Sequence, residues 1–381
     1  MDTLEKYALR VLEARGLNPV KSSIMSKVNA IFWTIVDGTF VITILMELVS
    51  NTSDIFTFVD NFSAITVASQ VVTKEIGLLT HQQEFRTVIT CLKEFWPKDK
   101  FGKQVKAKLD NIESFSKRFL QIYICSVACA VSLYMLKPIL EGNKILPIMW
   151  VTFCSLEESL YCYIFNYILQ VVWAACGLHM LVGFDCLFIL LLLCGYCELE
   201  QIKHALISLD PDETTDEDDA PLLDLIASLI EQHNRVLNLL KRIQDLLGSL
   251  LLLQFVATLL SLCASLFVLT SVDFPPSLPV VSKSLPYIFS VFTQNLIYCV
   301  AGQVISDQTL SVADAAYASK WWIKAQPQLR RMILLMILRS QRPEEMTAGG
   351  VFALNLETFV AIMKTTGSAL AFMNTVYGEE E

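Results

Sequence analysis

The sequence predicts an all-α membrane protein with seven transmembrane helices, a cytoplasmic N-terminus, an extracellular C-terminus and a cytoplasmic layer of anchor helices. Three observations lead to this prediction. Of the 381 residues, 54% are hydrophobic and 18% are charged, whereas a soluble domain has about 45–50% and about 25%. The hydrophobic residues form long blocks, each near the roughly 20 residues that a helix needs to cross a bilayer. Lys and Arg are concentrated in alternate connections between these blocks.

Seven blocks are predicted to cross the membrane, at residues 28–50, 54–79, 118–140, 162–197, 246–272, 280–302 and 350–376. The first block starts too late for a signal peptide, so we expect no cleavage. The fourth would be roughly 54 Å long as a helix, so it should continue well past the roughly 30 Å hydrocarbon core. Two short spans are the alternative for this block, although no turn-forming cluster interrupts it.

The distribution of basic residues predicts the orientation. The N-terminus and the segments 80–118, 198–245 and 303–349 hold 24 of the 29 Lys and Arg residues. The other loops hold only Lys144. Basic loops stay in the cytoplasm, so the N-terminus is predicted to lie inside, and an odd number of spans places the C-terminus outside. Asn51 begins an Asn-Thr-Ser glycosylation acceptor in the first external loop, which agrees with this topology.

The segment 303–349 is predicted to form cytoplasmic anchor helices. It has apolar residues at three- or four-residue spacing among polar ones, the pattern of an amphipathic helix, at Leu310, Ala313, Ala316, Tyr317 and Trp321. The acidic run 210–219 cannot bury apolar surface and is predicted to be a mobile cytoplasmic loop.

Several classes of function are disfavoured. The net charge of −9 argues against nucleic acid as a partner, because nucleic-acid binding requires a basic surface. The four His residues show no metal-ligand spacing. No phosphate-binding loop or nucleophile elbow occurs, so neither an enzyme nor a cofactor is expected. Most of the 11 Cys residues lie in apolar blocks and are interpreted as small buried residues rather than a disulfide framework.

The C-terminal third carries an ordered series of short motifs. The series consists of Tyr298-Cys299, Ser311-Val-Ala-Asp-Ala-Ala-Tyr317, Trp321-Trp322, Leu335-Met-Ile-Leu-Arg339-Ser-Gln-Arg-Pro343, Thr347-Ala-Gly-Gly350 and Leu354-Asn-Leu-Glu-Thr-Phe359. In this order and spacing the series closely resembles the insect odorant receptor family. The final helix departs from the family's commonest ending, since it has Thr366-Gly-Ser-Ala-Leu-Ala371 where a Ser- and Tyr-rich tract is usual.

The resemblance implies an odorant-gated, non-selective cation channel in the plasma membrane of olfactory sensory neurons. Four subunits would surround a pore lined by the last helix. The chain lacks the long insertion of the shared co-receptor (Orco), so it resembles a ligand-specific tuning subunit that joins Orco in a heterotetramer. The implied organisation is a cytoplasmic N-terminus (1–27), a six-helix bundle with the odorant pocket (28–302), the anchor helices (303–349), and a pore-lining helix with a short external tail (350–381).

The final helix has polar residues within a predicted span, which are costly unless they face a protein interior or a water-filled path. One face carries residues at three- or four-residue spacing, namely Ala361, Thr365, Ser368, Phe372 and Val376. The first three are predicted to line the pore, and Phe372 and Val376 to form an apolar gate near its outer mouth. The alternative is that Phe372 and Val376 only pack between subunits.

The family pattern places the odorant pocket in the outer half of the bundle, between spans two, three, four and six. The predicted lining residues are Phe58, Phe62, Val131, Tyr134, Met135, Phe165, Tyr167, Gln170, Tyr287 and Phe292. None is charged, which favours a small, neutral volatile, and an aromatic ring is one option for it. Aromatic residues in a membrane bundle can instead be ordinary core or belong to the interfacial belt.

Three other classes of membrane protein fit the sequence less well. A metabotropic seven-helix chemoreceptor has its N-terminus outside, opposite to the predicted orientation. A gustatory-type receptor channel is a poorer match, because Thr358-Phe359 is followed by Lys364-Thr365 where that branch carries a Gln-Phe pair. A secondary transporter would show inverted repeats, and none is detected.

Overall fold

The protein is described by a computed structural model that covers residues 2–50, 55–136, 138–139, 146–152, 154, 159–209, 220–271, 278–323 and 326–378. Asn51 and the acidic run 210–219 lie outside the described residues. The elements, in chain order, are α1 (Asp2–Ala14), α2 (Ile24–Ser50), α3 (Ile55–Thr80), α4 (Gln82–Cys91), η1 (Leu92–Glu94), α5 (Lys103–Met135), α7 (Leu160–Ile207), α8 (Ala220–Ser271), α9 (Leu278–Ala318), α10 (Pro327–Ser340), β1 (Thr347–Ala348), β2 (Phe352–Ala353) and α11 (Leu356–Gly378).

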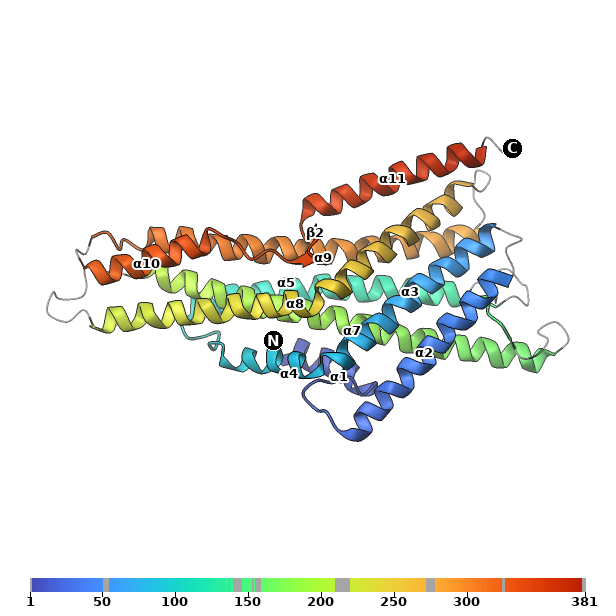
Figure 1. Ribbon diagram of the computed structural model, residues 1–381, viewed down its shortest axis with the longest axis horizontal. Helices are drawn as coiled ribbons and strands as arrows, with labels where there is room; N and C mark the ends of the chain where they lie inside the picture. The colour runs from blue at the N-terminus through green and yellow to red at the C-terminus, as the bar shows by residue number, and fades with distance from the viewer. Residues whose placement is uncertain are drawn as a thin grey trace.

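The predicted all-α membrane fold is confirmed. Four long helices, α5, α7, α8 and α9, run along the length of the molecule (Figure 1). Within the described residues, five helices are long and apolar enough to cross a membrane, namely α2, α5, α7, α8 and α9. Of the other two predicted spans, α3 carries Lys74 and Glu75 within its apolar run, and α11 carries Lys364. The count of seven spans and the orientation of the termini stay predictions.

The long helices continue well beyond the predicted spans. α7 is one helix of 48 residues, as the single-helix interpretation of the fourth block requires. α5 begins before residue 118, α8 begins before 246, and α9 passes residue 302 without a break to Ala318. The amphipathic segment after 302 therefore extends α9, because Ile305, Val312 and Ala316 keep facing the core.

The core lies around the second half of α7. From Met180 to Leu206 this helix is buried on nearly all sides, since α1, α5, α8 and α9 pack against it. A helix that is hydrophobic all round must be surrounded by other elements. One of these is α1, which fits so closely that a Cβ on Gly183 would lie 2.7 Å from Val11. The N-terminal segment is therefore a packed element of the bundle.

A two-stranded hairpin joins α10 to α11. Gly349 and Gly350 have φ values of +62° and +72°, so the turn requires residues without a Cβ. The hairpin is attached to α8, because Gln244 Nε2 donates to Thr347 O at 2.9 Å and Gly349 N donates to Gly248 O at 2.7 Å. After the hairpin, α11 diverges from the long axis while packing against α8 and α9 (Figure 1). The Thr347-Ala-Gly-Gly350 motif thus fixes where α11 begins.

Candidate ligand cavity and final helix

A cavity of about 150 Å³ lies among α3, α5, α7, α8 and α9. Most of its wall is apolar, and no charged side chain is among its described lining residues. Trp173 and Gly177 of α7 form one side, and Tyr287 and Gln294 of α9 form another. An apolar chamber with a few placed polar groups suits a small neutral organic molecule.

Four predicted pocket residues line this cavity, namely Val131, Tyr134, Met135 and Tyr287. Two others support its wall from behind. Gln170 exchanges hydrogen bonds with the backbone of Ile148, with its Nε2 donating to Ile148 O at 2.7 Å, and the Tyr167 hydroxyl donates to Met135 O at 2.9 Å. Ile148 and Met135 are themselves lining residues.

The remaining four predicted residues lie away from this cavity. Phe58 stacks on Phe62, which packs against Val59 and its neighbours on α8. Phe165 is 66% exposed on α7, on a surface suited to lipid. Phe292 faces the ring of Phe359 on α11. A ligand role for these four residues stays a prediction that the geometry of this cavity does not support.

Charged residues that the sequence analysis did not single out meet beside the cavity. Lys74 Nζ lies 2.7 Å from Asp185 Oδ1, and both side chains are almost fully buried. Three further side chains donate to the same carboxylate, namely Tyr123, Gln294 and Tyr298. A signal for this cluster was present, because ionisable residues within predicted spans mark buried partners or function.

A second buried ionic cluster joins α1 to α2 and α3. The Arg15 guanidinium donates to the carboxylates of both Asp37 and Glu75. Trp173 Nε1 donates to Asp37 Oδ1 at 2.7 Å. Because Trp173 also lines the cavity, this cluster holds one cavity wall in place.

The face of α11 that was predicted to line a pore is exposed in the single subunit. Ala361, Thr365, Ser368 and Phe372 are all exposed, and Phe372 is 71% exposed. The opposite face packs on the bundle, with Thr366 buried. Nothing is described for the side chain of Val376, which lies outside the described side chains although its backbone belongs to α11.

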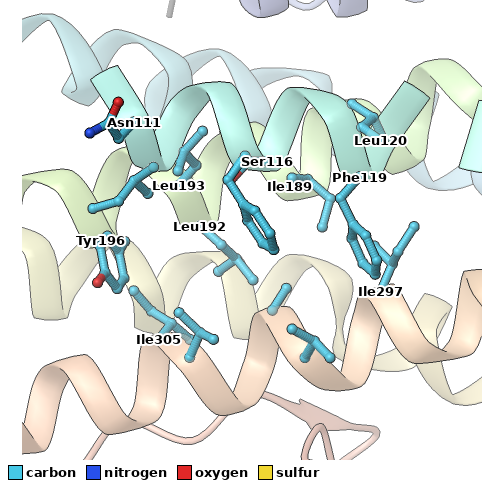
Figure 2. Close-up of a pocket in the computed structure, with 15 residues that line it drawn as sticks. Asn111, Ser116, Phe119, Leu120, Ile189, Leu192, Leu193, Tyr196, Ile297 and Ile305 are labelled. Atoms are coloured by element: carbon cyan, nitrogen blue, oxygen red, sulfur yellow. The ribbon is translucent and has the colours of Figure 1, made fainter. Parts of the chain in front are cut away.

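A groove of about 420 Å³ also runs between α5, α7 and α9 (Figure 2). Phe119 of α5, Leu192 of α7 and Ile297 of α9 face it, and its wall is almost entirely apolar. None of the predicted site residues lines this groove.

The described residues give no sign of metal chemistry. They contain no group of three or more His, Cys, Asp or Glu side chains placed to hold a metal ion. One disulfide joins Cys154 to Cys162 at the start of α7. The sequence analysis missed this pair, because Cys162 falls in an apolar block and Cys154 stands alone.

The long apolar helices and the cavity among them define a helical, multi-pass membrane protein. A family model described as 7tm Odorant receptor matches residues 54–367. The chain belongs to this odorant receptor family, which is a family of receptors and not of enzymes.

Individual proteins agree with this assignment. Odorant receptor 10 of Aedes albopictus is 26% identical over 211 residues, which span 55% of each chain. Odorant receptor 13a of Drosophila melanogaster is 23% identical over 358 residues, 88% of this chain and 84% of that one. The structure of the insect olfactory receptor OR5 from Machilis hrabei in complex with eugenol superposes with a TM-score of 0.83, at 14% identity and 98% coverage of both chains. At this identity the likeness shows the fold alone.

Proposed function

We propose that this chain is the odorant-binding subunit of a ligand-gated, non-selective cation channel in the plasma membrane of olfactory sensory neurons. The cavity among α3, α5, α7, α8 and α9 is the observation that carries the proposal. Its walls are neutral and largely apolar, which suits a small, neutral volatile, and an aromatic ring remains one option for it.

The pore is proposed to lie along α11. The exposed face of this helix alternates small and hydroxyl side chains with Phe372, a composition that is costly against lipid and suited to a water-filled path. The link from cavity to pore is α9. Gln294 lines the cavity, and Phe292, two residues earlier, contacts Phe359 of α11.

Assembly with Orco is proposed from the exposed apolar surface of α10 and α11. Leu334, Leu335 and Leu338 on α10 are 45–59% exposed, and Val360 and Phe372 on α11 are also exposed. Exposed apolar side chains on both helices are suited to contacts with neighbouring subunits. In the proposed heterotetramer, the neighbouring subunits cover this surface.

The test is electrical. Cells that express the chain with Orco should give an inward cation current in response to an odorant panel, including eugenol, and inhibition of G proteins should leave this current unchanged. Cells that express the chain alone should give little current. Loss of the current under G-protein inhibition would favour the metabotropic class, and robust current from the chain alone would refute the need for a partner.

A further inference from the structure

The Asp185 carboxylate is saturated by four hydrogen-bond donors from three other helices. Lys74 Nζ lies 2.7 Å and the Tyr298 hydroxyl 2.5 Å from Oδ1. Gln294 Nε2 lies 2.8 Å from Oδ2, which also accepts from the Tyr123 hydroxyl. All four of these groups donate to the carboxylate. Asp185 therefore acts on its neighbours only as an acceptor and fixes which atom each of them turns toward it.

Two of these four donors also line the ligand cavity, namely Tyr123 and Gln294. An amide side chain has a donating nitrogen and an accepting oxygen, and reversing it would place the oxygen of Gln294 against another acceptor, the Asp185 carboxylate. The amide nitrogen is thus held at Asp185, which leaves the oxygen as the atom of Gln294 that can accept from a ligand. The Tyr123 hydroxyl donates its single hydrogen to Asp185, so toward a ligand its oxygen can only accept.

We infer that the Asp185 end of the cavity selects odorants that carry a hydroxyl group, with Gln294 as the acceptor and Asp185 as the residue that positions it. This inference rests on the proposed odorant-binding function and narrows its ligand class. An alcohol or phenol donates its hydrogen to the Gln294 oxygen. An ether of the same size leaves that buried acceptor without a partner, and an unmatched buried polar group opposes binding.

Isomeric probes have the same composition and nearly the same size, and they differ in whether the oxygen carries a hydrogen. Benzyl alcohol is an isomer of anisole, and 1-hexanol is an isomer of methyl pentyl ether. The chain is purified with Orco in lipid nanodiscs, and the rise in unfolding temperature is titrated with each compound. The concentration that gives a fixed rise in unfolding temperature should be about five- to tenfold lower for each alcohol than for its isomeric ether, since one net hydrogen bond has about that effect.

Two variants test whether the preference for alcohols over ethers arises from the hydrogen-bond cluster around Asp185. Gln294→Met keeps the length of the side chain and removes its acceptor, so the alcohol-to-ether ratio should fall to about one while ether binding persists. Asp185→Asn should also reduce the ratio, because an amide at 185 can pair with either end of the Gln294 amide. The matched control is Gln254→Met, which changes a buried glutamine that does not line the cavity and should keep the full ratio.

Three results would overturn the inference. They are equal binding of alcohols and ethers by the unchanged chain, an unaltered ratio in Gln294→Met, and no stabilisation by any of the four compounds, since the cavity must admit them. The proposed function fails in a distinguishable way. In that case the alcohols bind with the expected preference, but the same preparation shows no ligand-gated current after reconstitution in planar bilayers.

Discussion

The ring of Phe292 on α9 lies edge-on against the ring of Phe359 on α11, with the centroids 5.0 Å apart and the planes at 74°. The contact joins the helix that lines the cavity to the helix that is proposed to line the pore. A second contact lies two to three turns further along α9, where a Cβ on Gly302 would meet Leu354 O at 2.2 Å. Movement of α9 would therefore be transmitted to the start of α11, because the two helices are closely packed at both contacts.

Replacing Phe292 should weaken gating and leave odorant preference unchanged. An edge-to-face aromatic pair contributes about 0.5–1.5 kcal/mol beyond its buried area, so Phe292→Ala should reduce the maximal odorant-evoked current by about two- to tenfold. Whole-cell recordings with several odorants measure both the maximum and the rank order. The control is Phe289→Ala, since Phe289 lies on the same helix but is 54% exposed. A changed rank order with an unchanged maximum would place Phe292 in ligand binding instead.

A larger side chain on α7 that fills part of the cavity should weaken the response to large odorants more than the response to small ones. Gly177 lines the cavity, and a Cβ there meets only Val71 at 3.8 Å, which is an ordinary contact. Gly177→Leu should therefore fold and remove ligand space, raising the half-maximal concentration about tenfold or more for the larger of two active homologues and less for the smaller. Concentration–response curves for a homologous series measure this shift. Gly38→Leu is the control, because a Cβ at Gly38 meets nothing within 4 Å. Equal shifts for all homologues would contradict the location of the cavity.

The sequence predicted the helical membrane fold because long apolar blocks are a strong signal of bilayer-spanning helices. It could not predict where the helices end. The residues of α5 before 118 and of α8 before 246 are amphipathic, so a hydropathy pattern assigns them to loops although they continue the same helices. The packing of α1 on α7 depends on the fit of Val11 at Gly183, a tertiary contact with no signal in the local pattern.

For the candidate site, the family resemblance and the predicted orientation together selected Val131, Tyr134, Met135 and Tyr287, which line the cavity. The same reasoning selected Phe165, which is exposed. A uniformly apolar helix shows no periodicity that separates a lipid-facing side from a cavity-facing side. Lys74 and Asp185 could have been noticed as charges within predicted spans, but their pairing across 111 positions required the structure.

The Arg15 cluster should be a major determinant of stability. Arg15→Met would leave the carboxylates of Asp37 and Glu75 buried without their cation. Removing one partner of a buried ion pair costs about 3–5 kcal/mol, so surface expression and the unfolding temperature should both fall. Adding Asp37→Asn and Glu75→Gln should restore much of the loss, because no buried charge is then left unpaired. Arg10→Met is the control, since Arg10 is exposed. A triple variant no more stable than Arg15→Met would argue against an electrostatic origin.

Glu198 should make stability depend on cytoplasmic pH. This residue lies beyond the predicted end of the fourth span, where its carboxylate accepts from Trp96 N at 3.2 Å and from Gln232 Nε2 at 2.6 Å. Burial raises the pKa of Glu198 from its ordinary value of 4.5 to about 7, although the hydrogen bonds from Gln232 and Trp96 oppose this rise. The folded state therefore holds the proton more tightly than the unfolded chain. The resulting stabilisation is complete below about pH 4.5 and is lost as the pH rises through about 7.

The measurement compares unfolding temperatures at pH 6 and pH 8. The unchanged chain should lose stability between these values relative to Glu198→Gln, whose amide stays neutral. Glu231→Gln serves as the control because the Glu231 side chain is 66% exposed. An identical pH dependence in the unchanged chain and in Glu198→Gln would contradict a pKa of about 7 for Glu198 in the folded state.

The gate is predicted at Phe372. This side chain is 71% exposed in the single subunit, on the same face of α11 as Ala361, Thr365 and Ser368. In a tetramer, four such faces would meet around one axis, and an apolar ring closes a narrow path by excluding water. Phe372→Ser should hydrate the constriction and raise the basal current about two- to tenfold. The effect should be partial, because Orco subunits contribute their own residues to the ring.

Leu370→Ser is the control, since Leu370 lies on the half-buried side of α11. Whole-cell recording measures the basal current before odorant, and single-channel recording measures the unitary conductance. If Phe372→Ser changed the rank order of odorants and left basal current and conductance untouched, the pore would not lie along this face of α11.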